Sequence, residues 1–394
     1  RLDMPGRTPL ILINDPGLAT GDEALFRGRA LTYYGRWTYK FEEAARQGAA
    51  AALIVHETAP AAYGWTTVVN SWANPQLDMQ AADGRAGRVA VEGWVTQARA
   101  AALLAAAGQD FGALKQAAST RGFKAVPLDA RASAAVRNGL RMSNSANVIA
   151  AIRGSQRPDE YVFYLAHWDH LGRTQGGEGD QTFNGAVDNA SGVAGLLAIA
   201  DAFRRLPQRP ARTVVFLAVT AEEQGLLGSG FYVAHPLVPL SQTVAALNMD
   251  ALCFGGRTRD VRVVGAGASG LERYLAEEAA RRGITPVPEL QPEKGHFYRS
   301  DHFVFAQAGV PAMYLKTGID DLDGGIAAGQ AREAEYVAQR YHQAGDNYTP
   351  GVQLGAGLEV VDLLYAIGER LANETTFPNW NEGNGFRAVR DRSR

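Results

Sequence analysis

Apolar and polar positions follow two different patterns along the chain, and the change between them falls near residue 122. Beyond that point, short runs rich in Val, Leu, Ile and Phe are separated by stretches with helical periodicity. Near-continuous apolar runs of this kind are typical of strands that are buried on both faces of a parallel sheet. We therefore predict strands at residues 146–152, 161–166, 213–219, 243–247 and 312–315.

The stretches between these strands predict amphipathic helices, among them residues 191–206 and 271–282. The first of these would place four apolar side chains on one face, Leu196, Leu197, Ala200 and Phe203. Regular alternation of buried strands with helices predicts an α/β fold, in which helices cover both faces of a mostly parallel sheet.

The first part of the chain has a looser pattern. Strands are predicted at residues 8–14, 51–55 and near 88–91, with helices at 39–48 and 96–107. This compact α/β region contains one histidine, His56, and no recognisable catalytic group, so we interpret it as a structural or substrate-facing module. Because 394 residues are too many for one ordinary core, we predict two domains, residues 1–122 and 123–394.

Composition excludes several classes of function. Hydrophobic residues make up 46% and charged residues 20% of the chain, which is typical of a globular protein. A net charge of −2 offers no field for nucleic acid or an acidic membrane, and no apolar run reaches the roughly 20 residues of a membrane span. The single cysteine, Cys253, excludes an internal disulfide and a cysteine-based zinc site. The chain starts at Arg1 without a leader, so we expect a processed chain or a fragment, of unknown oligomeric state.

Polar side chains gather where the predicted strands end. Ligands of parallel α/β sheets bind beyond the carboxyl ends of the strands, so side chains from these places should meet at one rim. A His-x-Asp at a strand end is by itself more often a turn, and its meaning depends on the rest of the set. That set consists of His167 and Asp169 after residues 161–166, Asp188 in a glycine-flanked loop, Glu222 and Glu223 after 213–219, Asp250 after 243–247, and His342.

This set of side chains fits a pair of zinc ions. Open catalytic zinc sites are built from imidazole nitrogens and carboxylate oxygens, and two ions about 3.5–4 Å apart can share a carboxylate and a hydroxide. Adjacent glutamates usually mark a solvated surface, but Glu222 and Glu223 follow an apolar strand. Because neighbouring residues point in different directions, one can bind metal while the other accepts the proton of the attacking water.

Five motifs resemble those of the double-zinc aminopeptidase family, the co-catalytic zinc exopeptidases that also include glutamate carboxypeptidase, the glutaminyl cyclases and the transferrin receptor. The resemblance runs from about residue 123 to the end and implies a mostly parallel mixed sheet sandwiched by helices, of the phosphorylase/hydrolase-like type. Residues 1–122 resemble the protease-associated domain that many members carry as an insertion, and are expected to be incomplete at their start. The motifs are HWDHLG (167–172), GAVDNASG (185–192), AEEQGLLGS (221–229), NMD (248–250) and YH (341–342).

The resemblance implies a role for each motif residue. His167, Asp188 and Asp250 would hold one zinc ion, and Asp188, Glu223 and His342 would hold a second, so that Asp188 bridges the pair. Glu222 would be the general base and acid, Asp169 would hydrogen-bond the free nitrogen of His167, and Tyr341 would stabilise the oxyanion. The peptide bond between Asp188 and Asn189 is often cis in this family.

Weaker signals surround these motifs. Asp301 and Arg299, in the segment YRSDH, are interpreted as contacts to a substrate amino group and a carboxylate, although a hydrogen-bonded bracing loop explains them equally well. His170 is interpreted as a structural neighbour of the ligand motif rather than a participant.

Together these observations predict a zinc-dependent exopeptidase, with an aminopeptidase acting on peptides as the preferred reading. A glutamate-carboxypeptidase-like enzyme would need converging arginines, for which Arg257, Arg259 and Arg299 are candidates. A glutaminyl cyclase would use a single zinc ion. A non-catalytic, receptor-like relative would have lost ligands that are all present here. Members with the inserted domain are commonly exported, so a periplasmic or extracellular location is expected.

Overall fold

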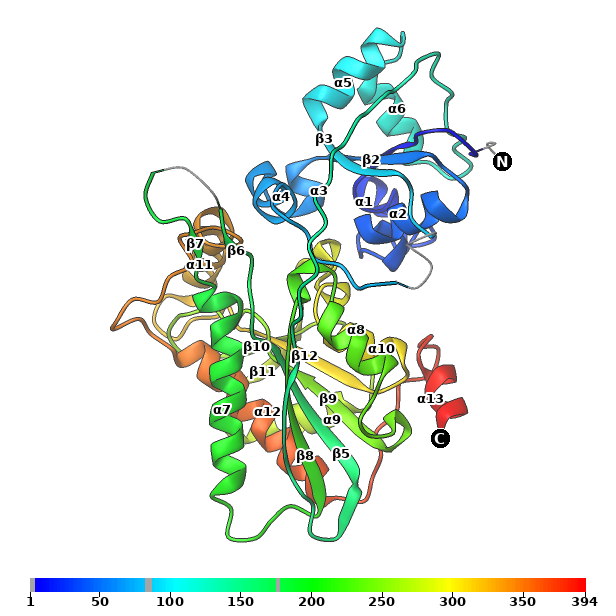
Figure 1. Cartoon of the computed structure of the whole chain (residues 1–394). Coiled ribbons are helices and arrows are strands. Elements are labelled where there is room, and N and C mark those ends of the chain that lie inside the picture. The colour runs from blue at the N-terminus through cyan, green and yellow to red at the C-terminus, as the bar shows by residue number, and fades with distance from the viewer. Residues whose placement is uncertain (1–3, 82–86, 175–177) are drawn as a thin grey trace. The chain divides into compact units, whose positions relative to one another are not determined.

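The chain folds into two compact units, seen in the computed structural model in Figure 1. The structure describes residues 4–81, 87–174 and 178–394. The predicted boundary at residues 122 and 123 differs from the observed division, in which the extended segment up to Ser143 groups with the smaller unit. The smaller unit comprises Arg1–Val68, Met79–Ser143 and Leu290–Tyr298, and the larger unit comprises Val69–Asp78, Asn144–Glu289 and Arg299–Arg394.

A parallel three-stranded sheet forms the centre of the smaller unit, with β2 (Ala51–His56) between β1 (Leu10–Leu12) and β3 (Val91–Thr96). The first two strands are where the apolar pattern predicts them, whereas β3 begins where the predicted strand ends. Phe41 and Ala44 pack on Ala52 and Ile54 of β2 in the core of this unit. The helices are α1 (Gly17–Thr20), α2 (Trp37–Arg46), α3 (Thr58–Ala61), α4 (Trp65–Trp72), which contains the boundary at Val68, α5 (Gln97–Ala106) and α6 (Phe111–Ala118).

The larger unit is built on a mixed seven-stranded sheet in the order β11-β10-β12-β9-β5-β8-β4. The four central strands, β12, β9, β5 and β8, run parallel, while β4 pairs antiparallel with β8 and β10 pairs antiparallel with β12. This is the predicted mostly parallel sheet. The strands are β4 (Val148–Ile152), β5 (Arg157–His167), β8 (Arg212–Val219), β9 (Thr243–Asn248), β10 (Asp260–Val263), β11 (Thr285–Pro288) and β12 (Ala312–Thr317), and a separate small sheet holds β6 (Gly172–Arg173) and β7 (Thr182–Phe183).

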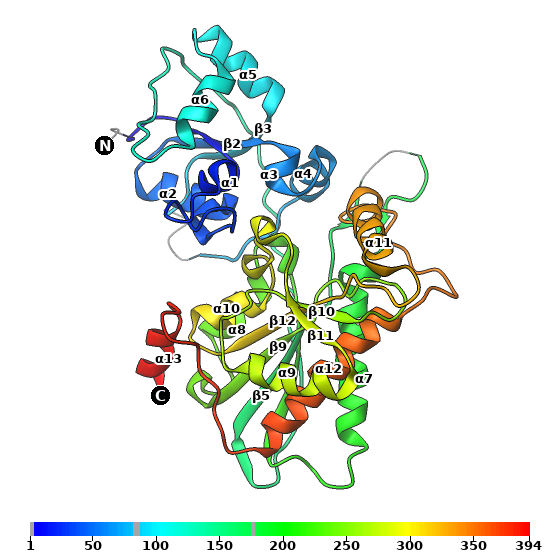
Figure 2. The same ribbon diagram turned by 180° about the vertical axis from the view of Figure 1, so that it is seen from behind.

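Helices cover both faces of this sheet (Figures 1 and 2). On one face α7 (Ser191–Arg204) and α12 (Gly355–Asn373) pack on the central strands, and on the other lie α8 (Leu227–Ala234) and α10 (His302–Gln307). The remaining helices are α9 (Leu271–Arg282), α11 (Gly325–Gln339) and α13 (Arg387–Ser393).

The predicted face of α7 is confirmed at three of its four positions. Leu196 and Phe203 are buried in the core with Ile199, and the partly buried Ala200 packs against it, whereas Leu197 is 67% exposed. Residues Ala186–Arg204 are apolar and long enough to match a membrane span by length and composition, and half of that window is buried inside the fold. A core helix on a sheet meets the same criteria, so the match is weak evidence for a span.

Candidate metal centre

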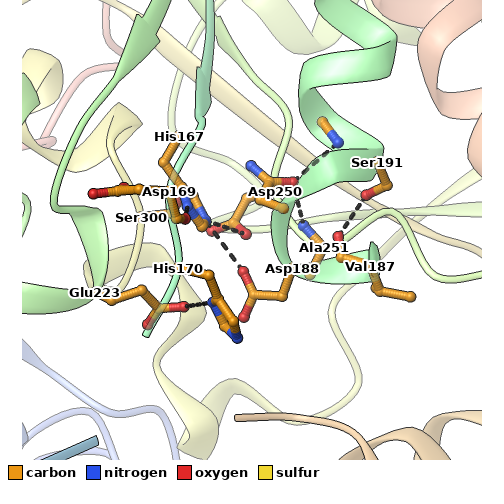
Figure 3. A network of polar contacts seen from close by, with 12 residues as sticks. His167, Asp169, His170, Val187, Asp188, Ser191, Glu223, Asp250, Ala251 and Ser300 are labelled. Carbon is orange, nitrogen blue, oxygen red and sulfur yellow. Dashed lines mark hydrogen bonds and ion pairs between the residues drawn. The ribbon is translucent and has the colours of Figure 1, made fainter. Parts of the chain in front are cut away.

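The central strand β5 ends at His167, between the ends of β8 and β9. The apolar residues 162–166 of β5 are fully buried, and the strand carries His167 to the rim of the sheet with only 1% of its side chain exposed. Its Nε2 lies 3.1 Å from Oδ1 of Asp188 and 3.4 Å from Oδ1 of Asp250, as Figure 3 shows. The predicted meeting of these side chains at one rim is therefore confirmed for His167, Asp188 and Asp250.

The loop before α7 holds Asp188 by its backbone. The peptide bond between Asp188 and Asn189 is cis, as the family resemblance implies. The side chain of Asn189 donates to the carbonyl of Met249 at 3.0 Å and accepts from the N–H of Ala251 at 3.2 Å, which ties the loop to the segment that follows β9.

A buried carboxylate supports the same loop from the other side. Asp346 accepts hydrogen bonds from the backbone N–H groups of Val187, at 3.0 and 3.1 Å, and of Asp188, at 3.0 Å. Asp346 is fully buried. Asp346 lies four residues after His342, outside the last motif, and no sequence pattern indicates that it supports the Asp188 loop.

The turn after β8 separates the two glutamates. Ala221 has a positive φ of 53°, and Glu222 and Glu223 begin a single 3₁₀ turn. Oδ2 of Asp169 accepts from the N–H of Ala221 at 2.6 Å and from the hydroxyl of Thr220 at 3.1 Å. The turn leaves that N–H without a strand partner, and the carboxylate satisfies it.

This contact changes the role predicted for Asp169. The Nδ1 atom of His167 lies 3.0 Å from the backbone carbonyl oxygen of Asp169, and not from its carboxylate. The carbonyl still fixes the tautomer of the imidazole, because it accepts the Nδ1 proton and leaves Nε2 free to face Asp188 and Asp250.

His342 reaches the same centre from the loop after α11. Its Nε2 lies 3.0 Å from Oε2 of Glu223 and 3.4 Å from Oδ2 of Asp188. His342 has a positive φ of 55°, and its carbonyl accepts a hydrogen bond from Asn70 at 2.8 Å. Oγ of Ser71 lies 2.8 Å from its Nδ1. No sequence pattern pointed to Asn70 or Ser71, which lie in the predicted domain without catalytic groups; both belong to the larger unit.

Asp188 is shared between two groups of ligands. We call His167, Asp188 and Asp250 the first cluster, and Asp188, Glu223 and His342 the second cluster. Oδ1 of Asp188 faces His167 in the first cluster, and Oδ2 faces His342 in the second cluster. Two ligand atoms of a tetrahedral zinc ion with bonds near 2.05 Å lie about 3.3 Å apart. The nitrogen–oxygen distances of 3.0–3.4 Å in the two clusters match that spacing.

The charges of the centre also fit a cation. Burial raises the pKa of Glu222 well above its usual range, and the carboxylates of Glu223 and Asp250 raise it further against the opposing effect of His167. Burial would raise the pKa of Glu223, but the combined effects of His342 and His170 lower that pKa to about 2. Burial would likewise lower the pKa of His342, yet Glu223 and Asp188 raise it to about 10. The buried carboxylates of this centre thus favour positive charge beside them, which a divalent cation would supply when it displaces protons.

His170 also lies in the centre, although the sequence suggested only a structural neighbour. Its Nδ1 is 2.8 Å from Oε1 of Glu223 (Figure 3). One ligand atom from each of His170, Asp188 and Glu223 lies within 4.8 Å of the others. The signal was its position in the same motif, three residues after His167.

The remaining predicted residues lie around this centre. Asp301 is fully buried, and its carboxylate accepts from the hydroxyl of Ser229 at 2.6 Å. Burial raises the pKa of Asp301 to about 7 against the opposing effect of His167. The ring of Tyr341 packs on that of His342, with centroids 4.0 Å apart, and Arg299 is half-buried.

Comparison with known proteins places the chain in a family. Residues 147–364 match the model of peptidase family M28. Aminopeptidase NAALADL1 of Mus musculus is 28% identical over 243 residues, which cover 56% of this chain and 30% of the relative. A probable zinc metalloprotease of Pyricularia oryzae is 41% identical over 274 residues, 62% of this chain and 51% of the relative. The chain thus spans about half or less of the length of these relatives.

Among solved structures, an aminopeptidase from Aneurinibacillus sp. strain AM-1 is 18% identical, with a TM-score of 0.49 and coverage of 95% of this chain and 76% of that one. The family model spans more than half of the chain and contains all five motifs, from His167 to His342. The chain therefore belongs to peptidase family M28.

Proposed function

We propose that the chain is a zinc-dependent exopeptidase with two zinc ions, and that it acts as an aminopeptidase on peptides. The observation that carries the proposal is the position of Asp188, whose two carboxylate oxygens face His167 and His342 separately. Family membership and the names of the relatives, an aminopeptidase and a zinc metalloprotease, support it.

Each cluster would hold one ion, the first through His167 and Asp250, the second through Glu223 and His342, with Asp188 common to both. Zinc bound in such sites supplies a Lewis acid for the scissile carbonyl and lowers the pKa of a bound water. The protein holds the ligands rigid through the hydrogen bonds that bind Asp188 and His342 from behind.

Glu222 is the group that moves the proton. It is buried, one of its carboxylate oxygens lies within 4.8 Å of ligand atoms of His167 and Glu223, and neither cluster as defined above needs it as a ligand. Its raised pKa suits a carboxylate that accepts a proton from the attacking water and returns it to the departing amine. Tyr341 is proposed to donate its hydroxyl to the developing oxyanion, with its ring held against His342. Asp301 and Arg299 remain proposed contacts to the substrate.

A specific observation weakens the carboxypeptidase alternative. That activity needs arginines that converge on substrate carboxylates, but Arg257 pairs with Glu359 at 2.7 Å. Arg259 pairs with Asp320 at 3.1 Å and donates to two backbone carbonyls. Both guanidinium groups are thus engaged by the protein. A glutaminyl cyclase with one zinc ion, or a receptor-like relative without zinc, differs from the proposal in metal content.

The smaller unit and the location extend the proposal. We propose that the smaller unit is a protease-associated domain, and its small parallel sheet with flanking helices supports this. We also propose that the protein is exported, because family members that carry such a domain are commonly exported. Detection of the native protein in periplasmic or culture fractions, against a cytoplasmic marker, tests the location.

The test of the function compares a leucine-initiated peptide with its N-acetylated twin, with chelator present and after zinc is restored. The expected result is zinc-dependent cleavage of the free-amine peptide alone, by protein that binds two equivalents of zinc. Cleavage of neither peptide by protein with two bound zinc ions would reject the aminopeptidase, and failure to bind zinc would reject the metallopeptidase altogether.

A further inference from the structure

His170 is a buried histidine with no assigned role in the centre described above. It lies in the loop between β5 and β6, and 6% of its side chain is exposed. Among the residues that the structure describes, neither of its ring nitrogens has a hydrogen-bond partner, although both are shielded from solvent. Buried polar atoms are nearly always partnered, so this imidazole needs an explanation.

Its surroundings are those of a ligand. Nδ1 of His170 lies 2.8 Å from Oε1 of Glu223, while Oε2 of the same carboxylate faces Nε2 of His342 at 3.0 Å. The two imidazole rings lie 5.6 Å apart at an angle of 80°. Glu223 is therefore placed between two imidazoles, as Asp188 is.

A glycine leaves the space that the ring of His170 occupies. A Cβ atom at Gly185 would lie 3.0 Å from Cγ of His170 and 2.3 Å from the carbonyl oxygen of Asp188. Gly185 also has a φ of +59°, which residues with a side chain rarely adopt. A side chain at residue 185 would therefore clash with the carbonyl of Asp188 and crowd the His170 ring.

We infer that His170 is a further metal ligand of the second cluster, an inference that rests on the proposed metal pair. The contact between Nδ1 and Oε1 of Glu223 lacks hydrogen-bond geometry, since Glu223 Oε1 also has no such partner among the described residues. Nδ1 of His170 and Oε1 of Glu223 are both buried and lie side by side, as two atoms that bind the same metal ion do. The ideal separation of two such atoms is about 3.3 Å.

The consequence is an asymmetric pair of sites. The second cluster gains a fourth protein ligand, His170, and holds its ion more tightly. The first cluster keeps three ligands, and its open position is left for water and substrate.

Isosteric variants separate a ligand from a hydrogen-bond donor. Asp and Asn place an atom where Nδ1 stands in His170, but only Asp offers an anionic oxygen to a metal and only Asn offers an N–H to Glu223. Zinc affinity is measured for the full chain by competition with a chromophoric chelator. Partners of ligands already change metal affinity 10–100-fold, so loss of a ligand is expected to weaken the tighter zinc step at least about 100-fold.

The expected result is this loss in H170A and H170N, with H170D within about tenfold of the wild type. Wild-type affinity in H170N would overturn the inference and leave His170 as a donor that positions Glu223. His235, an exposed histidine at the end of α8, supplies the matched control H235A, whose zinc affinity is expected to be unchanged.

X-ray absorption of the wild-type protein gives a second reading that needs no variant. Three imidazoles shared by two zinc ions give about 1.5 per zinc, against about 1.0 if His170 is not bound. A value of about 1.0 in protein that binds two zinc ions and cleaves peptides would reject the inference and leave the proposed function standing. Absence of bound zinc would reject the proposed function itself.

Discussion

Replacement of Ser71 by alanine tests whether the centre depends on groups behind its ligands. Oγ of Ser71 lies 2.8 Å from Nδ1 of His342, and both residues are buried, at 6% and 8% exposed. The hydroxyl of Ser71 can accept a hydrogen bond from the Nδ1–H of His342, and in that tautomer Nε2 is left to bind a metal beside Glu223 and Asp188. No other hydrogen bond to Nδ1 of His342 is present in the described part of the chain.

The size of the effect follows from what S71A leaves behind. A methyl group cannot accept or donate, so Nδ1 of His342 becomes an unpaired buried polar atom, at a cost of about 1–3 kcal/mol. Loss of such a partner lowers metal affinity about 10–100-fold, or about 1.4–2.8 kcal/mol. We therefore expect S71A to weaken one of the two zinc steps by that factor and to leave the other step unchanged.

The assay is a zinc titration of the full chain with a competing chelator, with thermal unfolding of the same samples. S71T keeps the hydroxyl and should retain most of the affinity. S393A removes a hydroxyl that donates to the carbonyl of Arg390 at 2.9 Å in α13, and serves as the control. If both zinc affinities of S71A equal those of S393A, His342 is oriented without Ser71 and the reasoning is refuted.

Three further predictions concern proton transfer, loop support and pH. E222Q should lower kcat about 10²–10⁴-fold while two zinc ions still bind; steady-state kinetics and metal analysis check this, and an unchanged kcat contradicts it. D346A removes the acceptor of the Val187 and Asp188 N–H groups and should cost about 2–6 kcal/mol in urea unfolding; a loss below that range contradicts the bracing role. Burial lowers the pKa of Lys40 from 10.5 to about 8, against the opposing effect of the Asp15 carboxylate. The unfolded state then binds more protons between these pH values, so stability gains from Lys40 as pH rises from 8 to 10.5; K40M should remove this gain, and equal pH slopes for both proteins would contradict it.

The sequence predicted the central sheet well because its strands are buried on both faces. Such strands appear as near-continuous apolar runs. Each predicted strand of the larger unit starts within two residues of the observed start, except for β5, which begins four residues before the prediction, at Arg157. The edge strand β11 and its neighbour β10 were missed, since neither is a long apolar run: β10 carries Asp260 and Arg262, and β11 contains two prolines. Residues 379–394 are largely polar, yet Trp380 and Arg390 within this segment are buried in the fold.

The site could be predicted where strand direction alone determines position. His167, Glu222, Glu223 and Asp250 follow parallel neighbouring strands, so their meeting is a consequence of topology. His342 is different, because it follows a helix, and only the family resemblance indicated its place. The supporting groups Ser71 and Asp346 reach their partners across 271 and 158–159 residues, a separation that no local pattern encodes.

Asp169 shows why a short-range pairing in sequence is a poor guide to a role. It stands two residues from His167, so a contact between carboxylate and imidazole was the natural prediction. The turn after β8, with its positive φ at Ala221, exposes a backbone N–H that neither strand nor helix satisfies. A charged acceptor contributes more to that buried N–H than to an imidazole that the Asp169 carbonyl already serves. The backbone requirement of one motif thus determines the side-chain role in another, and this depends on contacts between strands rather than on the spacing within either motif.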